Sequence, residues 1–118
     1  IRVDPESGLV FSPAHFTWMD TDYPAGTPRQ GYAIEIQALW YAAVGLLARV
    51  DRPEYQQNWQ HLAPKVQTSI LNLFRPNYLM YLSDCLHASF GESATRAMPD
   101  DALRPNHLLA ITLGAVSD

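Results

Sequence analysis

The chain has 118 residues, of which 47% are hydrophobic and 17% charged, and its net charge is −4. This composition excludes an intrinsically disordered chain, and the length allows one domain at most. No run of Lys or Arg could follow a phosphate backbone, and no apolar segment reaches the roughly 18 residues of a membrane span. We therefore expect neither nucleic acid nor a membrane as a partner.

Residues 1–29 predict irregular structure, because prolines and glycines interrupt them and no apolar period persists. A loop of this length is uncommon in a compact domain and is usually functional when it is ordered. We therefore interpret residues 1–29 as an active-site loop region and residues 30–118 as a helical segment of the same domain.

Residues 30–50 predict a helix that is apolar on nearly every face and ends before Pro53. Such a helix is expected to be buried on all sides. So short a chain supplies little to bury it against, so we expect neighbours from outside the chain. Without them, exposed helix faces should cause self-association and leave the isolated chain marginally stable.

Residues 54–74 predict a second helix with a single apolar stripe. The stripe consists of Tyr55, Trp59, Leu62, Val66, Ile70 and Leu73. Pro64 lies inside this helix and should kink it or split it in two. Residues 75–101 are expected to be irregular, apart from a short extended piece around 78–82.

A third helix is predicted to begin at Pro105, since proline is favoured in the first turn, and to run through Leu113. No internal repeat and no low-complexity tract is visible. The elements together predict an all-α fold of about three helices with long loops.

Residues 17–20 (Thr-Trp-Met-Asp) place Asp20 close to the indole of Trp18. A carboxyl group held against an indole loses hydration, which raises its pKa and lets it act as a general acid near neutral pH. Glycoside hydrolysis requires such an acid and a second carboxylate, and the indole could stack on a sugar ring. The alternative is that Asp20 caps a turn and Trp18 packs in the core.

Glu35 lies inside the apolar first helix, where an unpaired carboxylate is costly, and Arg29 is a nearby partner. The pair could hold the loop against the helix, or its charged groups could face sugar hydroxyls. Spacing alone does not decide between these roles.

Residues 104–106 (Arg-Pro-Asn) open the third helix. Asn106 would direct its amide toward whatever lies at that helix end, and Arg104 could bind a carboxylate or a hydroxyl group. A plain capping role is the simpler interpretation.

Cys85 is the single cysteine, so no disulfide can form within the chain, which favours a reducing compartment. We therefore expect a cytoplasmic protein in which Cys85 is a small buried hydrophobic residue. The four histidines show no metal-ligand spacing, and no phosphate-binding loop is visible. We expect no metal and no cofactor.

Four blocks of sequence, taken in order, are similar to a known family. They are residues 17–20 (Thr-Trp-Met-Asp), 27–31 (Thr-Pro-Arg-Gln-Gly), 34–41 (Ile-Glu-Ile-Gln-Ala-Leu-Trp-Tyr) and 104–106 (Arg-Pro-Asn). This order and spacing resembles the amylo-α-1,6-glucosidase domain of glycogen debranching enzymes. The resemblance covers most of residues 8–113. It departs from the family pattern at Gln37, where the family usually has Asn, and at Ala42, where it also has Asn.

The resemblance implies an (α/α)6 toroid, so that the chain would form a partial toroid. It also implies that Asp20 is the general acid of an inverting hydrolase that releases glucose from α-1,6-linked branch stubs. Trp18, Arg29 and Glu35 would line the glucose-binding end, and Asn106 would help to shape it. The implied substrate is a branched α-glucan, such as glycogen or a limit dextrin.

Twelve helices of about 11–12 residues do not fit into 118 residues. The resemblance therefore implies a segment of the toroid, inactive alone, whose second catalytic carboxylate lies outside this chain. One alternative is a trehalase-like or other exo-α-glucosidase on the same toroid. Another is a non-catalytic helical module that binds carbohydrate or protein, in which Asp20 and Glu35 are structural.

Overall fold

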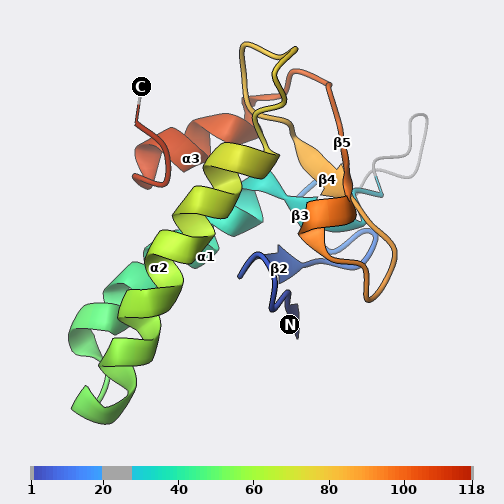
Figure 1. The fold of residues 1–118 in the computed structure, drawn as a ribbon. Helices are drawn as coiled ribbons and strands as arrows, with labels where there is room; N and C mark the ends of the chain where they lie inside the picture. Colours follow the sequence, from blue (N-terminus) through green and yellow to red (C-terminus); the bar gives the residue numbers. More distant parts are fainter. Residues whose placement is uncertain (1, 20–27, 118) are drawn as a thin grey trace.

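The computed structural model describes residues 2–19 and 28–117, which form three α-helices and two small antiparallel sheets (Figure 1). The strands are β1 (Arg2–Val3), β2 (Val10–Phe11), β3 (Gly31–Ala33), β4 (Cys85–His87) and β5 (Met98–Pro99). The α-helices are α1 (Ile34–Val50), α2 (Pro53–Leu73) and α3 (Leu108–Thr112), and the 3-10 helices are η1 (Ala94–Arg96) and η2 (Pro105–His107).

The prediction of an all-α fold, and with it of a partial (α/α)6 toroid, is wrong. β1 pairs with β2, and β3, β4 and β5 form a second sheet in that order, so the described residues form a mixed domain of helices and strands. Each strand has only two or three residues. Strands this short leave no measurable alternation of apolar and polar residues, which is the pattern that predicts a strand.

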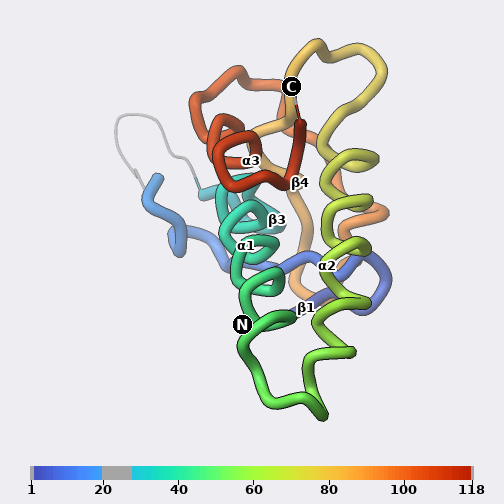
Figure 2. Tube along the Cα trace, turned by 90° about the vertical axis from the view of Figure 1, so that its left-hand side faces the viewer, coloured from blue at the N-terminus to red at the C-terminus, as the bar shows by residue number. Residues whose placement is uncertain are grey.

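The helix predictions are confirmed in type and nearly in extent. α1 and α2 form a hairpin and lie side by side (Figures 1 and 2). Pro64 lies inside a single continuous α2, so it does not split the helix. The third helix starts at Pro105 as the turn η2 and continues as α3. Among residues 2–19 and 28–117, no helix is both long enough and apolar enough to cross a membrane.

The first helix starts later than predicted, because the residues before it pair with β4. Ala33 lies opposite Cys85 in the register of β3 and β4, and the amide of Ile34 donates to the carbonyl of Asp84 at 3.0 Å. The chain therefore passes directly from β3 into α1. This junction brings Asp84 beside the first turn of α1, although the two lie about fifty residues apart in sequence.

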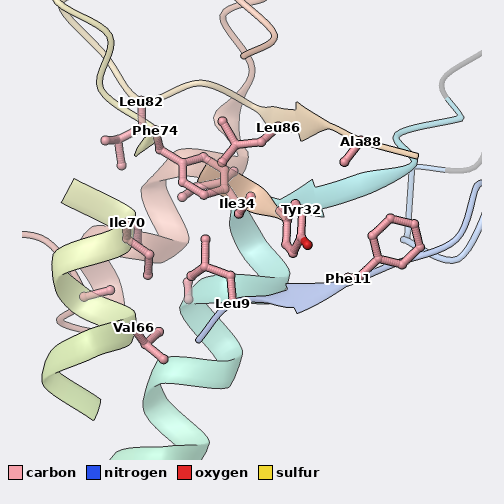
Figure 3. Close-up of a cluster of buried hydrophobic side chains, with 14 residues drawn as sticks. Leu9, Phe11, Tyr32, Ile34, Val66, Ile70, Phe74, Leu82, Leu86 and Ala88 are labelled. Atoms are coloured by element: carbon pink, nitrogen blue, oxygen red, sulfur yellow. The ribbon is translucent and has the colours of Figure 1, made fainter. Parts of the chain in front are cut away.

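The hydrophobic core lies where the helix hairpin meets the β3–β4–β5 sheet and the N-terminal segment (Figure 3). Its largest fully buried aliphatic and aromatic side chains are Leu9, Tyr32, Ile34, Val66, Ile70, Phe74 and Leu86. The described residues leave one face of α1 open, because Leu39, Leu46 and Val50 are half exposed or more. Self-association through this face stays a prediction.

Two buried polar side chains hold the N-terminal segment on this core. The Gln37 amide bonds both backbone groups of Val10, accepting from its N–H at 2.7 Å and donating to its carbonyl at 2.9 Å. The Asp4 carboxylate accepts from the hydroxyls of Ser7 and Ser93 and from the amide of Ala94. Asp4 thereby connects the N-terminal turn to η1, about ninety residues later in the chain.

These contacts give Asp4 a role in acid stability. Burial raises the pKa of Asp4, but the hydrogen bonds from Ser7 and Ser93 outweigh this effect and hold the pKa below its usual value of 3.8. A lowered folded-state pKa stabilises the fold above the unfolded value, and this stability is lost as pH falls through the folded one. Asp4→Asn should therefore flatten the decrease in unfolding free energy between pH 6 and pH 3, measured by urea denaturation. Asp101→Asn, at an exposed position, is the control and should leave the dependence of the unfolding free energy on pH as it is in the unaltered protein. The same pH dependence in the unaltered protein, Asp4→Asn and Asp101→Asn would contradict the role of Asp4 in acid stability.

Candidate functional site

Arg29 is the buried centre of the candidate site, and its side chain is only 1% exposed. Its Nη2 donates to Oε2 of Glu35 at 2.6 Å, and its Nη1 donates to Oε1 of the same carboxylate. On its other edge, Nε donates to Oδ2 of Asp84 at 2.9 Å. Nη1 also donates to Oγ1 of Thr17 at 3.1 Å. One guanidinium group thus joins the loop, the first turn of α1 and the residue before β4.

Two features show how strongly this arrangement is fixed. Burial would lower the pKa of Arg29, but hydrogen bonding and charge from Glu35 and Asp84 raise it above its usual value. The backbone of Arg29 has φ of +46°, in the left-handed region that non-glycine residues rarely adopt. Such a conformation costs on the order of 1–3 kcal/mol and persists only where the surroundings enforce it. In this structure the conformation occurs together with the buried contacts of the Arg29 side chain with Glu35 and Asp84.

Asp84 is the second centre, because its side chain, fully buried, bonds three different donors. Its Oδ2 accepts from Arg29 and, at 2.7 Å, from Nη1 of Arg104. Its Oδ1 accepts from Nδ2 of Asn106, also at 2.7 Å. A buried carboxylate needs such partners, since an unpaired one would be strongly destabilising.

Arg104 extends the cluster toward the surface. Its Nη1 also donates to Oδ2 of Asp100 at 3.1 Å, and the same oxygen lies 3.1 Å from Nε2 of the half-exposed His87. Burial raises the pKa of Asp100, but bonds from the Ala102 amide, Arg104 and His87 lower it overall. The ionic groups that we call the charge network are Arg29, Glu35, Asp84, Arg104 and Asp100.

Asn106 connects the charge network to an exposed aromatic ring. It is buried, and its Oδ1 accepts from Nε1 of Trp18 at 3.2 Å, while its Nδ2 lies 3.1 Å from the sulfur of Met19. Trp18 is 69% exposed, so it does not pack in the core. The result is an indole whose ring faces solvent and whose N–H is held by a buried amide.

The structure brings together four of the five predicted site residues. Arg29 and Glu35 form the expected ion pair, while Trp18 and Asn106 are hydrogen-bonded to each other. Arg104 binds carboxylates, as the sequence suggested. Asp20 lies outside the described residues, and its role stays a prediction. Whether Arg29, Glu35, Trp18 or Asn106 contacts substrate is likewise still a prediction.

Asp84 is the site residue that the sequence analysis missed. A signal was present, because Asp84 stands inside the mostly apolar run 82–86, just as Glu35 stands inside an apolar helix. A carboxylate in such surroundings requires a partner. Its partners come from positions 29, 104 and 106, and no short-range pattern connects these.

Cys85 follows Asp84 and is fully buried, as expected for a small hydrophobic residue. Burial raises the pKa of its thiol to about 12, which keeps it protonated and unreactive near neutral pH. Within residues 2–19 and 28–117, no three His, Cys, Asp or Glu side chains are grouped so that they could hold a metal ion.

The site therefore presents an exposed indole whose N–H is hydrogen-bonded to a buried amide beside buried ionic groups. A comparison with models of protein families identifies one family. The model of the family described as amylo-alpha-1,6-glucosidase matches residues 1–117, and the chain belongs to this family. A search of curated proteins gives no match. The family confirms the resemblance to glycogen debranching enzymes and implies a glycosidase whose substrate is a glucan.

Proposed function

We propose that this chain supplies the general acid and a sugar-stacking surface of a debranching glycosidase that cleaves α-1,6-linked glucose at branch stubs with inversion. The single observation that carries the proposal is the placement of Trp18. Its indole is exposed to solvent, and a buried amide holds its N–H, two positions before Asp20 in the sequence. The family to which the chain belongs supports the glucan as substrate.

In this mechanism Trp18 stacks on a glucose ring while Asp20 donates its proton to the oxygen of the α-1,6 bond. A second carboxylate activates a water on the opposite face of the ring. Inverting enzymes hold the two carboxyl groups about 6.5–9.5 Å apart to leave room for that water. Arg29 and Glu35 serve the reaction by fixing the loop to α1 at the glucose-binding end.

The acid role predicts that Asp20→Asn lowers turnover about 100-fold, since an amide cannot protonate the leaving group. The measurement is release of glucose from a limit dextrin by the protein expressed from its complete gene. Affinity for isomaltose, measured by calorimetry, should remain within a few-fold, because the stacking surface is unchanged. Asp101→Asn is the matched control for loss of an acidic residue and should leave turnover intact. Unchanged turnover in Asp20→Asn would sink the proposal.

The alternatives give different results in the same assays. A trehalase-like or other exo-α-glucosidase would release glucose from a substrate with another linkage and not from the limit dextrin. A non-catalytic binding module would bind isomaltose and release no glucose from any of these substrates.

A further inference from the structure

We propose that Asp84 is a positioning residue that sets the orientation of the Trp18 ring through the side-chain amide of Asn106. The inference rests on the proposed role of Trp18 as the sugar-stacking surface, and it explains why that surface is held in one place. It assigns Asn106 to positioning and not to contact with the sugar.

The first step is the orientation of the Asn106 amide. An ionised carboxylate can only accept hydrogen bonds and an indole N–H can only donate one, whereas an amide has a donor end and an acceptor end. Nδ2 lies 2.7 Å from Oδ1 of Asp84, and Oδ1 lies 3.2 Å from Nε1 of Trp18. The reverse orientation would oppose two acceptors at Asp84 and two donors at Trp18. The carboxylate therefore selects the amide orientation that can bind the indole.

The second step is that Asp84 is itself held in place. Its Oδ2 accepts from Nε of Arg29 and from Nη1 of Arg104, at 2.9 and 2.7 Å. Its side chain is fully buried, so no solvent competes for the oxygen that binds Asn106. Its backbone carbonyl accepts from the amide of Ile34 at the first residue of α1. Asn106 is therefore oriented by a carboxylate whose own residue is hydrogen-bonded to the first residue of α1 and directly precedes β4.

The third step concerns the ring. A side chain that is 69% exposed has little packing to restrict its rotamer, and the bond from Nε1 to Asn106 supplies that restriction. A surface already fixed in its bound geometry loses less conformational entropy when a ligand stacks on it. The indole N–H, and not only the aromatic face of Trp18, should therefore contribute to sugar affinity.

The test is a double-mutant cycle on isomaltose affinity in the protein expressed from its complete gene. Trp18→Phe keeps an aromatic face but removes the N–H, and Asn106→Leu removes its acceptor. Each single change should weaken binding about three- to tenfold, the range of one hydrogen bond. The double variant should bind no more weakly than the weaker single variant, because both changes remove the same interaction. Effects that multiply would overturn the inference.

A second measurement tests, without sugar, whether Asp84 acts on Trp18 through Asn106; we call this chain of two hydrogen bonds the relay. The protein is labelled with ¹⁵N only at the tryptophan indoles, and the N–H resonance of Trp18 is the one that disappears in Trp18→Phe. Asn106→Leu and Asp84→Asn should each shift this resonance and speed the exchange of its proton with solvent. An unchanged resonance in either Asn106→Leu or Asp84→Asn would also overturn the inference. Trp59→Phe is the control, because the indole N–H of Trp59 binds Asp51 and should not affect isomaltose affinity.

The two measurements separate this inference from the proposed function. If the resonance responds as expected but isomaltose does not bind the unaltered protein, the relay is supported and the proposed sugar-stacking role of Trp18 fails. If Trp18→Ala abolishes binding while Asn106→Leu does not weaken it, the stacking role is supported and the relay fails.

Discussion

Replacing Arg29 by methionine is expected to lower the free energy of unfolding by about 3–5 kcal/mol, the cost of leaving buried charges without their partner. The variant removes both ion pairs of one guanidinium group, and Glu35 and Asp84 remain buried with like charges near each other. A small domain is stable by only about 5–15 kcal/mol, so this loss is a large fraction of the total. Urea denaturation followed by circular dichroism measures the loss.

Two further variants make this result specific. Arg29→Lys should recover only part of the stability, because a single ammonium group cannot bind two carboxylates in the planar, forked geometry of a guanidinium. Arg96→Met is the matched control, since Arg96 pairs with Glu6 on the surface and both side chains are at least half exposed. Exposed pairs contribute little, so the urea midpoint should hardly move. Equal destabilisation by the changes at Arg29 and Arg96 would show that the buried network is not what stabilises the fold.

Replacing Gly31 by alanine is the second change with a large expected effect, a loss of about 3 kcal/mol or more. A Cβ at this position would overlap the carbonyl oxygen of Leu86 and lie 2.8 Å from the amide of Ala88. The φ of Gly31, +128°, is also one that side chains rarely permit. Both obstacles are backbone atoms in or directly after β4, the strand that pairs with β3. The two strands must therefore separate to admit the methyl group. The measurement is the urea midpoint together with amide exchange of β4.

Gly45 provides a control with the opposite sign. It lies inside α1, and an added Cβ would meet no atom within 4 Å. Gly45→Ala should therefore stabilise the domain by about 0.5–1 kcal/mol, because alanine favours the helix and restricts the unfolded chain. If Gly31→Ala were as stable as Gly45→Ala, close contact between β3 and β4 would be ruled out.

The part of the fold that follows from local pattern was predictable. α2 has an apolar residue every three or four positions, and the structure has the helix within one residue of the predicted bounds. The pairing of β3 with β4 was not predictable, because the paired residues lie more than fifty positions apart in sequence. Contacts over that distance leave no trace in the spacing of side chains along one strand.

In the candidate site, too, contacts between residues close in sequence were easier to predict than contacts between distant ones. The cost of a carboxylate in an apolar helix indicated that Glu35 needs a partner, and it made Arg29, six positions away, one candidate. The structure shows that the two residues form an ion pair. Asp84 posed the same problem, but its solution required knowing that β4 lies beside β3. The exposure of Trp18 could not be predicted from the sequence either, since an indole is found both in cores and on surfaces.

The junction of β3 with α1 has a consequence for how the site is assembled. The site takes its side chains from four segments, at Arg29, Glu35, Asp84 and Asn106. Their hydrogen bonds form only when β4 has paired with β3 and the start of the third helix has docked beside Asp84. A partly folded chain would hold its helices yet present no oriented indole. Because loop closure over such sequence distances has a high entropic cost, the sugar binding that we propose should arise in the last cooperative step of folding. It should also be the first property lost when that step reverses.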